Sequence, residues 1–120
     1  NIKVLPDLNA NGRLTLGENL ADHGGLQVAY YALKNATKTQ ALPVIDGLTP
    51  EQRFFLAYAG VWAGNINEAE IRNRTKSDPH SLSRWRVNGA LPHIDMWYEA
   101  FGIKEGDKMF IPKSERLELW

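Results

Sequence analysis

Residues 16–38 carry apolar side chains at the spacing of an α-helix. The recurring apolar positions are Leu20, Leu26, Ala29, Tyr30 and Leu33. Two adjacent glycines, Gly24 and Gly25, interrupt the pattern, and each costs roughly 1 kcal/mol relative to alanine inside a helix. The segment therefore predicts either a helix that breaks at the glycines or a continuous helix that another element approaches very closely.

A second helix is predicted to begin at Thr49. Thr49 can cap the helix, Pro50 suits its first turn, and Gln52 can complete a capping box. Apolar residues then follow on nearly every side as far as Trp62. A helix that is apolar all round belongs in the interior, so we expect this helix to be the buried centre of the core.

The rest of the chain predicts shorter elements. A polar helix from Asn67 to about Ser77 should lie on the surface, because Pro79 bars its continuation. A final helix is expected from about Pro92 to Phe101, and the tail from Lys104 onward can dock on the body through its apolar residues. The expected fold is mainly α and forms one domain over residues 1–120.

The N-terminal residues differ from this helical pattern. Residues 1–5 fit a short strand, and the segment from Pro6 to Gly12 reads as a turn-rich loop, because proline fixes φ while Asn and Gly tolerate left-handed conformations. The sequence begins at Asn1 without methionine, which we interpret as a cut from a longer protein, although a processed mature chain would look the same.

Composition excludes several classes of function. Fourteen basic residues balance fourteen acidic ones, so overall charge favours neither nucleic acid nor an anionic membrane as the main partner. Cysteine is absent, which excludes disulfides and thiolate chemistry, and no apolar run approaches the roughly 20 residues that span a bilayer. The compartment is left open.

Two carboxylates, Glu18 and Asp22, lie four residues apart and therefore on one face of the first helix. Like charges at this spacing destabilise an isolated helix, so the pair is best explained if a cation or a histidine lies opposite it. By spacing alone, an ordinary pair of surface carboxylates explains the pattern as well.

Four blocks resemble one known family. The string from Gly17 to Leu26 resembles the G-E-N-x-A-D-x-G-G signature of neprilysin, endothelin-converting enzyme and bacterial endopeptidase O, which are zinc metallopeptidases. Residues 54–62 are similar to the family's F-F-L-x-x-A-x-x-W helix, whose role we expect to be core packing. Residues 78–81 and 84–91 are similar to its D-x-H-[SA] and F-R-V-x-G-x-L blocks, in the same order. The resemblance covers nearly the whole chain.

The resemblance implies a role for each of four residues. Glu18 would be the third zinc ligand, and Asp22 would steady a zinc-binding histidine and serve as proton donor. His80 would stabilise the oxyanion, and Arg86 would bind a main-chain carbonyl of a peptide substrate. Independently of the resemblance, Asp78 lies two residues from His80 in a turn and could orient it. The chemistry is apt, because catalytic zinc keeps three protein ligands and one open position. The fold implied is the helical C-terminal subdomain of a thermolysin-like (gluzincin) endopeptidase.

The departures from the family matter as well. No histidine here is followed by Glu, so the H-E-x-x-H helix, with two zinc ligands and the general base, is missing. We expect the isolated chain to retain no zinc and to cleave no peptide, and its partner to be the rest of its own catalytic domain. The uncovered face bearing Glu18, Asp22 and Gly25 favours self-association. Vertebrate members carry cysteines that are absent here, which indicates a bacterial relative.

Two other classes of function compete with this interpretation. Residues 81–92 also resemble the recognition helix of a helix-turn-helix protein, with Arg84 and Arg86 facing DNA, but Pro79 and the neutral charge argue against it. A non-catalytic helical module that binds another protein is the third interpretation. His23 and His93 receive no role, and His23 is expected to be a plain surface or interface side chain.

Overall fold

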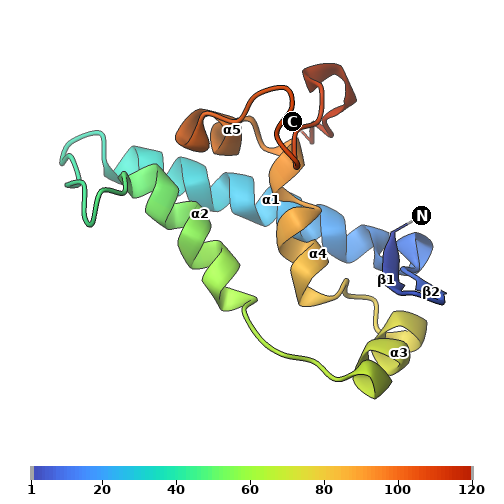
Figure 1. Cartoon of the computed structure of the whole chain (residues 1–120). Helices are drawn as coiled ribbons and strands as arrows, with labels where there is room; N and C mark the ends of the chain where they lie inside the picture. Colours follow the sequence, from blue (N-terminus) through green and yellow to red (C-terminus); the bar gives the residue numbers. More distant parts are fainter. Residues whose placement is uncertain (1, 120) are drawn as a thin grey trace.

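The computed structural model describes residues 2–119, and its longest element is helix α1 (Gly12–Ala36), which runs across the middle of the molecule (Figure 1). The Asn11 side chain caps α1 by accepting a hydrogen bond from the backbone N–H of Leu14 at 3.2 Å. The helix is continuous through Gly24 and Gly25. The expectation that the helix breaks at these two glycines is therefore wrong.

Helix α2 (Pro50–Val61) begins where the sequence predicts. The capping box is present, because Thr49 Oγ1 accepts from the Gln52 N–H at 3.2 Å and Gln52 Oε1 accepts from the Thr49 N–H at 3.0 Å. The Gln52 side chain also donates to the carbonyl of Ala100 at 2.9 Å, which ties α2 to α5 (Asp95–Phe101).

The core lies where α1, the first half of α2 and α5 meet. Its buried side chains are Leu26, Tyr30, Phe55, Leu91, Ile94, Trp97 and Tyr98. The Tyr30 and Phe55 rings stack at 5.6 Å between centroids, so the aromatic residues join α1 to α2. The expected mainly helical fold is confirmed.

The expectation that α2 forms the buried centre of the core is wrong for this chain. Only Phe55 of α2 is buried, whereas Leu56 is 47% exposed and Val61 is 72% exposed. The reason is geometric: α1 and α5 cover one side of α2, and its second half extends away from them (Figure 1).

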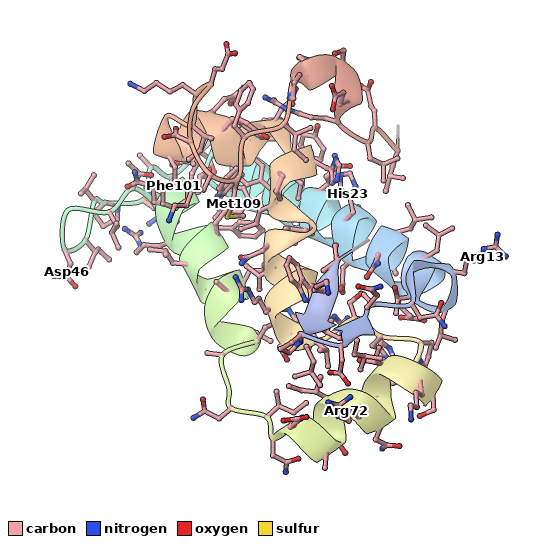
Figure 2. All side chains as sticks on the ribbon, turned by 45° about the vertical axis from the view of Figure 1, so that its right-hand side comes forward. Arg13, His23, Asp46, Arg72, Phe101 and Met109 are labelled. Atoms are coloured by element: carbon pink, nitrogen blue, oxygen red, sulfur yellow. The ribbon has the colours of Figure 1, made fainter. Side chains whose placement is uncertain are left out.

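The N-terminal segment forms a small hairpin. Strands β1 (Lys3–Leu5) and β2 (Leu8–Asn9) pair antiparallel, so β2 lies within the segment expected to be loop. Beside the hairpin lies α3 (Glu68–Ser77), a polar surface helix as predicted (Figure 2). Arg72 of α3 binds both carboxylate oxygens of Asp7 at 2.9 Å and fastens this helix to the hairpin turn.

The C-terminal third folds back on the core. After α4 (Ser83–Asn88) come the 3₁₀ turn η1 (Leu91–His93), α5, and a second 3₁₀ turn, η2 (Lys113–Glu115). The helix expected from Pro92 begins at Asp95 instead, because Pro92 lies in η1. The tail docks through Tyr98, whose hydroxyl accepts from the Ile111 N–H at 2.9 Å. Within residues 2–119, no helix has the length and apolar character needed to cross a membrane.

Candidate active site

Helix α1 presents Glu18 and Asp22 on one face, and the chain returns to that face much later. His80 comes from the loop between α3 and α4, and Arg86 comes from α4. The structure thus brings together all four residues to which the family resemblance assigns a role. It also places a histidine and a cation opposite the two carboxylates, as their spacing predicts.

Asp22 and Arg86 form a bidentate ion pair. Nε and Nη2 of Arg86 donate to the two carboxylate oxygens of Asp22, each at 2.6 Å. The side chains are only 12% and 16% exposed, respectively, so little water screens the pair. The carboxylate raises the pKa of the Arg86 guanidinium above its usual value.

His80 lies between two carboxylates. Its Nδ1 is 2.8 Å from Asp78 Oδ1, and its Nε2 is 3.2 Å from Glu18 Oε2. The same Asp78 oxygen accepts the backbone N–H of His80 at 2.9 Å. These two hydrogen bonds, the backbone one first, lower the pKa of the Asp78 carboxyl. Asp78 therefore fixes the His80 ring, as expected, and aims Nε2 at Glu18.

A chain of hydrogen bonds anchors the His80 loop to α1. The Ser81 hydroxyl donates to Asn19 Oδ1 at 2.7 Å, and Asn19 Nδ2 donates to Thr15 Oγ1 at 3.2 Å. Asn19 lies between the two site carboxylates in sequence, so the same turn of α1 carries both the site and its support. Asn19 and Ser81 were assigned no role from the sequence, although each lies inside one of the four blocks that resemble the family.

Helix α2 also reaches the site, although its residues were expected only to pack in the core. The Tyr58 hydroxyl donates to the backbone carbonyl of Arg86 at 3.0 Å, and the Trp62 ring lies beneath the Arg86 guanidinium. Burial, and after it the Asp22 carboxylate, raises the pKa of Tyr58. The sequence signal for this contact was the spacing of Tyr58 and Trp62, because residues four apart on a helix lie on the same side of it.

The described residues do not form a complete metal site. Residues 2–119 contain no group of three or more His, Cys, Asp or Glu side chains placed to hold a metal ion. Glu18 is a half-exposed carboxylate and can supply one oxygen ligand. The donor set of this part of the chain therefore fits one ligand of a zinc site and no more.

An apolar groove of about 430 Å³ runs between α1 and α2 beside the ion pair. It is lined by small and apolar side chains together with Asp22, and the lining includes Ala21, Gly25, Ala29, Phe54, Ala57 and Val61. A Cβ at Gly25 would meet no atom within 4 Å. Within residues 2–119, nothing packs close enough to Gly25 to require a glycine there.

His23 points away from the groove, toward the C-terminal segment (Figure 2). Of the two expectations for His23, a surface or an interface side chain, the surface one is wrong, because His23 is 2% exposed and its ring stacks on His93 at 6.3 Å between centroids. Neither ring nitrogen of His23 has a hydrogen-bond partner among the described residues. His93 Nδ1 accepts the backbone N–H of Leu117 at 3.0 Å, so the pair also secures the tail.

This histidine pair predicts a pH dependence of folding stability. Burial, followed by the nearby His93, lowers the pKa of His23, and burial lowers the pKa of His93. The unfolded chain therefore binds protons first, starting near the ordinary value of 6.5. The contribution of the two neutral histidines to the free energy of unfolding should be fully present above that pH. It should be lost as the pH falls toward the lowered pKa values of the folded chain.

Urea denaturation of the chain between pH 5.5 and 8 checks this. The double variant His23→Leu/His93→Asn should flatten the dependence of the unfolding free energy on pH over this range. An unchanged slope in the double variant would show that other groups cause the dependence.

The sequence of this chain matches a known protein family. The sequence model of peptidase family M13 matches residues 2–117. Human endothelin-converting enzyme 1 is 41% identical over 114 residues, which cover 92% of this chain and 14% of that protein. Neprilysin-3 of Drosophila melanogaster is 35% identical over 114 residues, with the same coverage.

The fold is also similar to solved structures. The zinc metalloprotease ZMP1 of Mycobacterium tuberculosis, in complex with an inhibitor, superposes with a TM-score of 0.90 at 38% sequence identity. This match covers 93% of the present chain and 17% of that protein. The open state of the same enzyme gives a TM-score of 0.87. The present chain thus spans less than a fifth of the length of these relatives.

Proposed function

The chain belongs to peptidase family M13, and from this premise we propose that it is the C-terminal part of the catalytic domain of a zinc-dependent endopeptidase that hydrolyses oligopeptides. One observation carries the proposal: Glu18, Asp22, His80 and Arg86 meet on one side of α1 and pair with one another. The absence of cysteine favours a bacterial source for the enzyme.

Each of these residues then has a task for which its surroundings suit it. Glu18 would supply one carboxylate ligand to zinc, which as a Lewis acid polarises the scissile carbonyl and activates water. His80, oriented by Asp78, would donate a hydrogen bond to the oxyanion that develops on the carbonyl oxygen. Arg86, held in place by Asp22, would donate to a main-chain carbonyl of the peptide.

We further propose that the groove between α1 and α2 receives the rest of the catalytic domain. The groove-lining residues of α2 and the small residues of α1 leave an apolar surface that residues 2–119 do not cover. An incoming helix can approach α1 closely at Gly25, where a Cβ has open space around it. In the isolated chain the same surface would favour self-association.

A mixing experiment tests the proposed function. Zinc content and cleavage of an oligopeptide are measured for this chain alone and after mixing with the upstream segment of the same protein that carries H-E-x-x-H. We expect the chain alone to retain no stoichiometric zinc at micromolar concentration, because one carboxylate is a poor site, and we expect zinc and cleavage to appear on mixing.

The variant Glu18→Ala provides the control. It removes a half-exposed ligand without disturbing the core, so the mixed complex should form and yet hold zinc far more weakly. A folded complex that binds zinc equally well with Glu18→Ala would refute the assignment of Glu18. A folded complex without peptidase activity would favour the non-catalytic, protein-binding alternative.

The DNA-binding alternative has less support. Arg86, which would have to face DNA, is bound to Asp22 and largely buried, and Arg84 lies over the ring of Trp85. Helix α4 also has only six residues, which is short for a helix that lies in the major groove. A salt-dependent shift of duplex DNA by the chain would revive this alternative.

A further inference from the structure

The indole of Trp62 lies against the guanidinium of Arg86, where α2 ends. The Cζ atom of Arg86 is 3.8 Å from the centroid of the Trp62 ring, against 5.2 Å for Arg84 over Trp85. Both members of the first pair are half-buried. A cation over an indole face is attracted by the ring electrons more strongly when water is excluded, so this contact can hold the arginine side chain in place.

Two further contacts hold the same arginine. Asp22 binds the edge formed by Nε and Nη2 at 2.6 Å, and Tyr58 binds the backbone carbonyl of Arg86 at 3.0 Å. Tyr58 and Trp62 are four residues apart and therefore lie on one side of α2. The carboxylate fixes the guanidinium in its plane, and the indole prevents the plane from tilting.

The Trp62 ring also meets Tyr58. Trp62 Nε1 is buried and makes no hydrogen bond of ideal geometry among residues 2–119, but it lies close enough to Tyr58 to act as a donor, which partly offsets the rise that burial causes in the pKa of Tyr58. The indole therefore contacts both the guanidinium of Arg86 through its face and the side chain that binds the Arg86 carbonyl.

We propose that Trp62 is a positioning residue for Arg86, which it holds so that the free edge of the guanidinium faces the peptide substrate. Nε and one N–H of Nη2 are used by Asp22, while the N–H groups of Nη1 have no partner among the described residues. One N–H of Nη1 and the second N–H of Nη2 run parallel along this free edge and can both donate to a carbonyl oxygen. The inference rests on the proposed role of Arg86 and extends it to α2.

The test measures kcat/KM for an oligopeptide in the intact peptidase. Trp62→Leu removes the ring face and should lower kcat/KM about 10- to 30-fold, whereas Trp62→Phe retains a ring and should stay within about threefold. Arg84→Ala is the matched control, because it removes the looser stacking pair outside the site, and it should have no effect. In an Arg86→Ala background, Trp62→Leu should change kcat/KM less than about twofold.

The double-mutant cycle of Trp62→Leu and Arg86→Ala tests this inference separately from the proposed function. Full activity of Arg86→Ala would refute the role of Arg86 itself. A loss from Trp62→Leu that is as large in the Arg86→Ala background would show that Trp62 does not act through the arginine. Full activity of Trp62→Leu would also overturn the inference. If near-ultraviolet circular dichroism shows that Trp62→Leu is misfolded, Trp62→Met, which fills the space without a ring face, replaces it in the cycle.

Discussion

Replacing Asp22 by asparagine in the intact peptidase is expected to lower kcat/KM by about 100-fold. Asparagine retains the size of aspartate but loses the charge, so Arg86 is left half-buried without its bidentate carboxylate. The guanidinium would then be free to turn away from the substrate carbonyl. The same substitution should weaken the proposed support of a zinc-binding histidine by the Asp22 carboxylate, which lowers metal affinity as well.

The chain offers a matched control for this variant. Asp7 and Arg72 also form a bidentate ion pair, through Nη1 and Nη2 of the arginine, but the pair is exposed and lies at the hairpin. Asp7→Asn should leave kcat/KM unchanged, because exposed pairs contribute little and no site residue contacts this one. Equal activity of the Asp22 and Asp7 variants would refute the catalytic assignment of Asp22. In the isolated chain, Asp22→Asn should also lower the free energy of unfolding, by about 1–3 kcal/mol.

Local sequence signals predicted the elements whose determinants are local. The capping box at Thr49 and Gln52 fixed the start of α2, and the polar composition of residues 67–77 fixed α3 on the surface. A histidine or cation opposite Glu18 and Asp22 was one of two interpretations of their spacing, because an ordinary surface pair of carboxylates explained it as well. The structure has both a histidine and a cation there. The identities of these partners came only from the resemblance of residues 78–91 to a known family.

The features that could not be predicted from the sequence depend on contacts between distant parts of the chain. The sequence does not say that His23 faces His93, because no local pattern links these positions. Likewise, the apolar character of α2 indicates burial but not what buries it, and here one side of the helix lacks cover from residues 2–119. The contribution of Trp62 to the site was missed for the related reason that an apolar helix was read only as core.

Substitution of Gly25 should have effects of opposite sign on the stability of the isolated chain and on its assembly with the upstream segment. Gly25→Leu places a good helix former at an open position of α1, so it should stabilise the isolated chain by about 1 kcal/mol. The added side chain would enter the groove between α1 and α2, where the rest of the catalytic domain is proposed to pack. Overpacking by about 1–3 kcal/mol corresponds to roughly 5- to 150-fold weaker assembly with the upstream segment.

Gly60→Leu separates helix propensity from occlusion of the groove. Gly60 lies within α2, a Cβ there also meets no atom within 4 Å, and it is not one of the groove-lining residues. It should raise the stability of the chain to a similar degree while leaving assembly intact, as measured by urea denaturation and by sedimentation velocity of the mixture. Assembly of Gly25→Leu with undiminished affinity would mean that the groove is not the docking surface. A homodimer of the isolated chain that dissociates in Gly25→Leu but not in Gly60→Leu would show that a second copy uses the same groove when the upstream segment is absent.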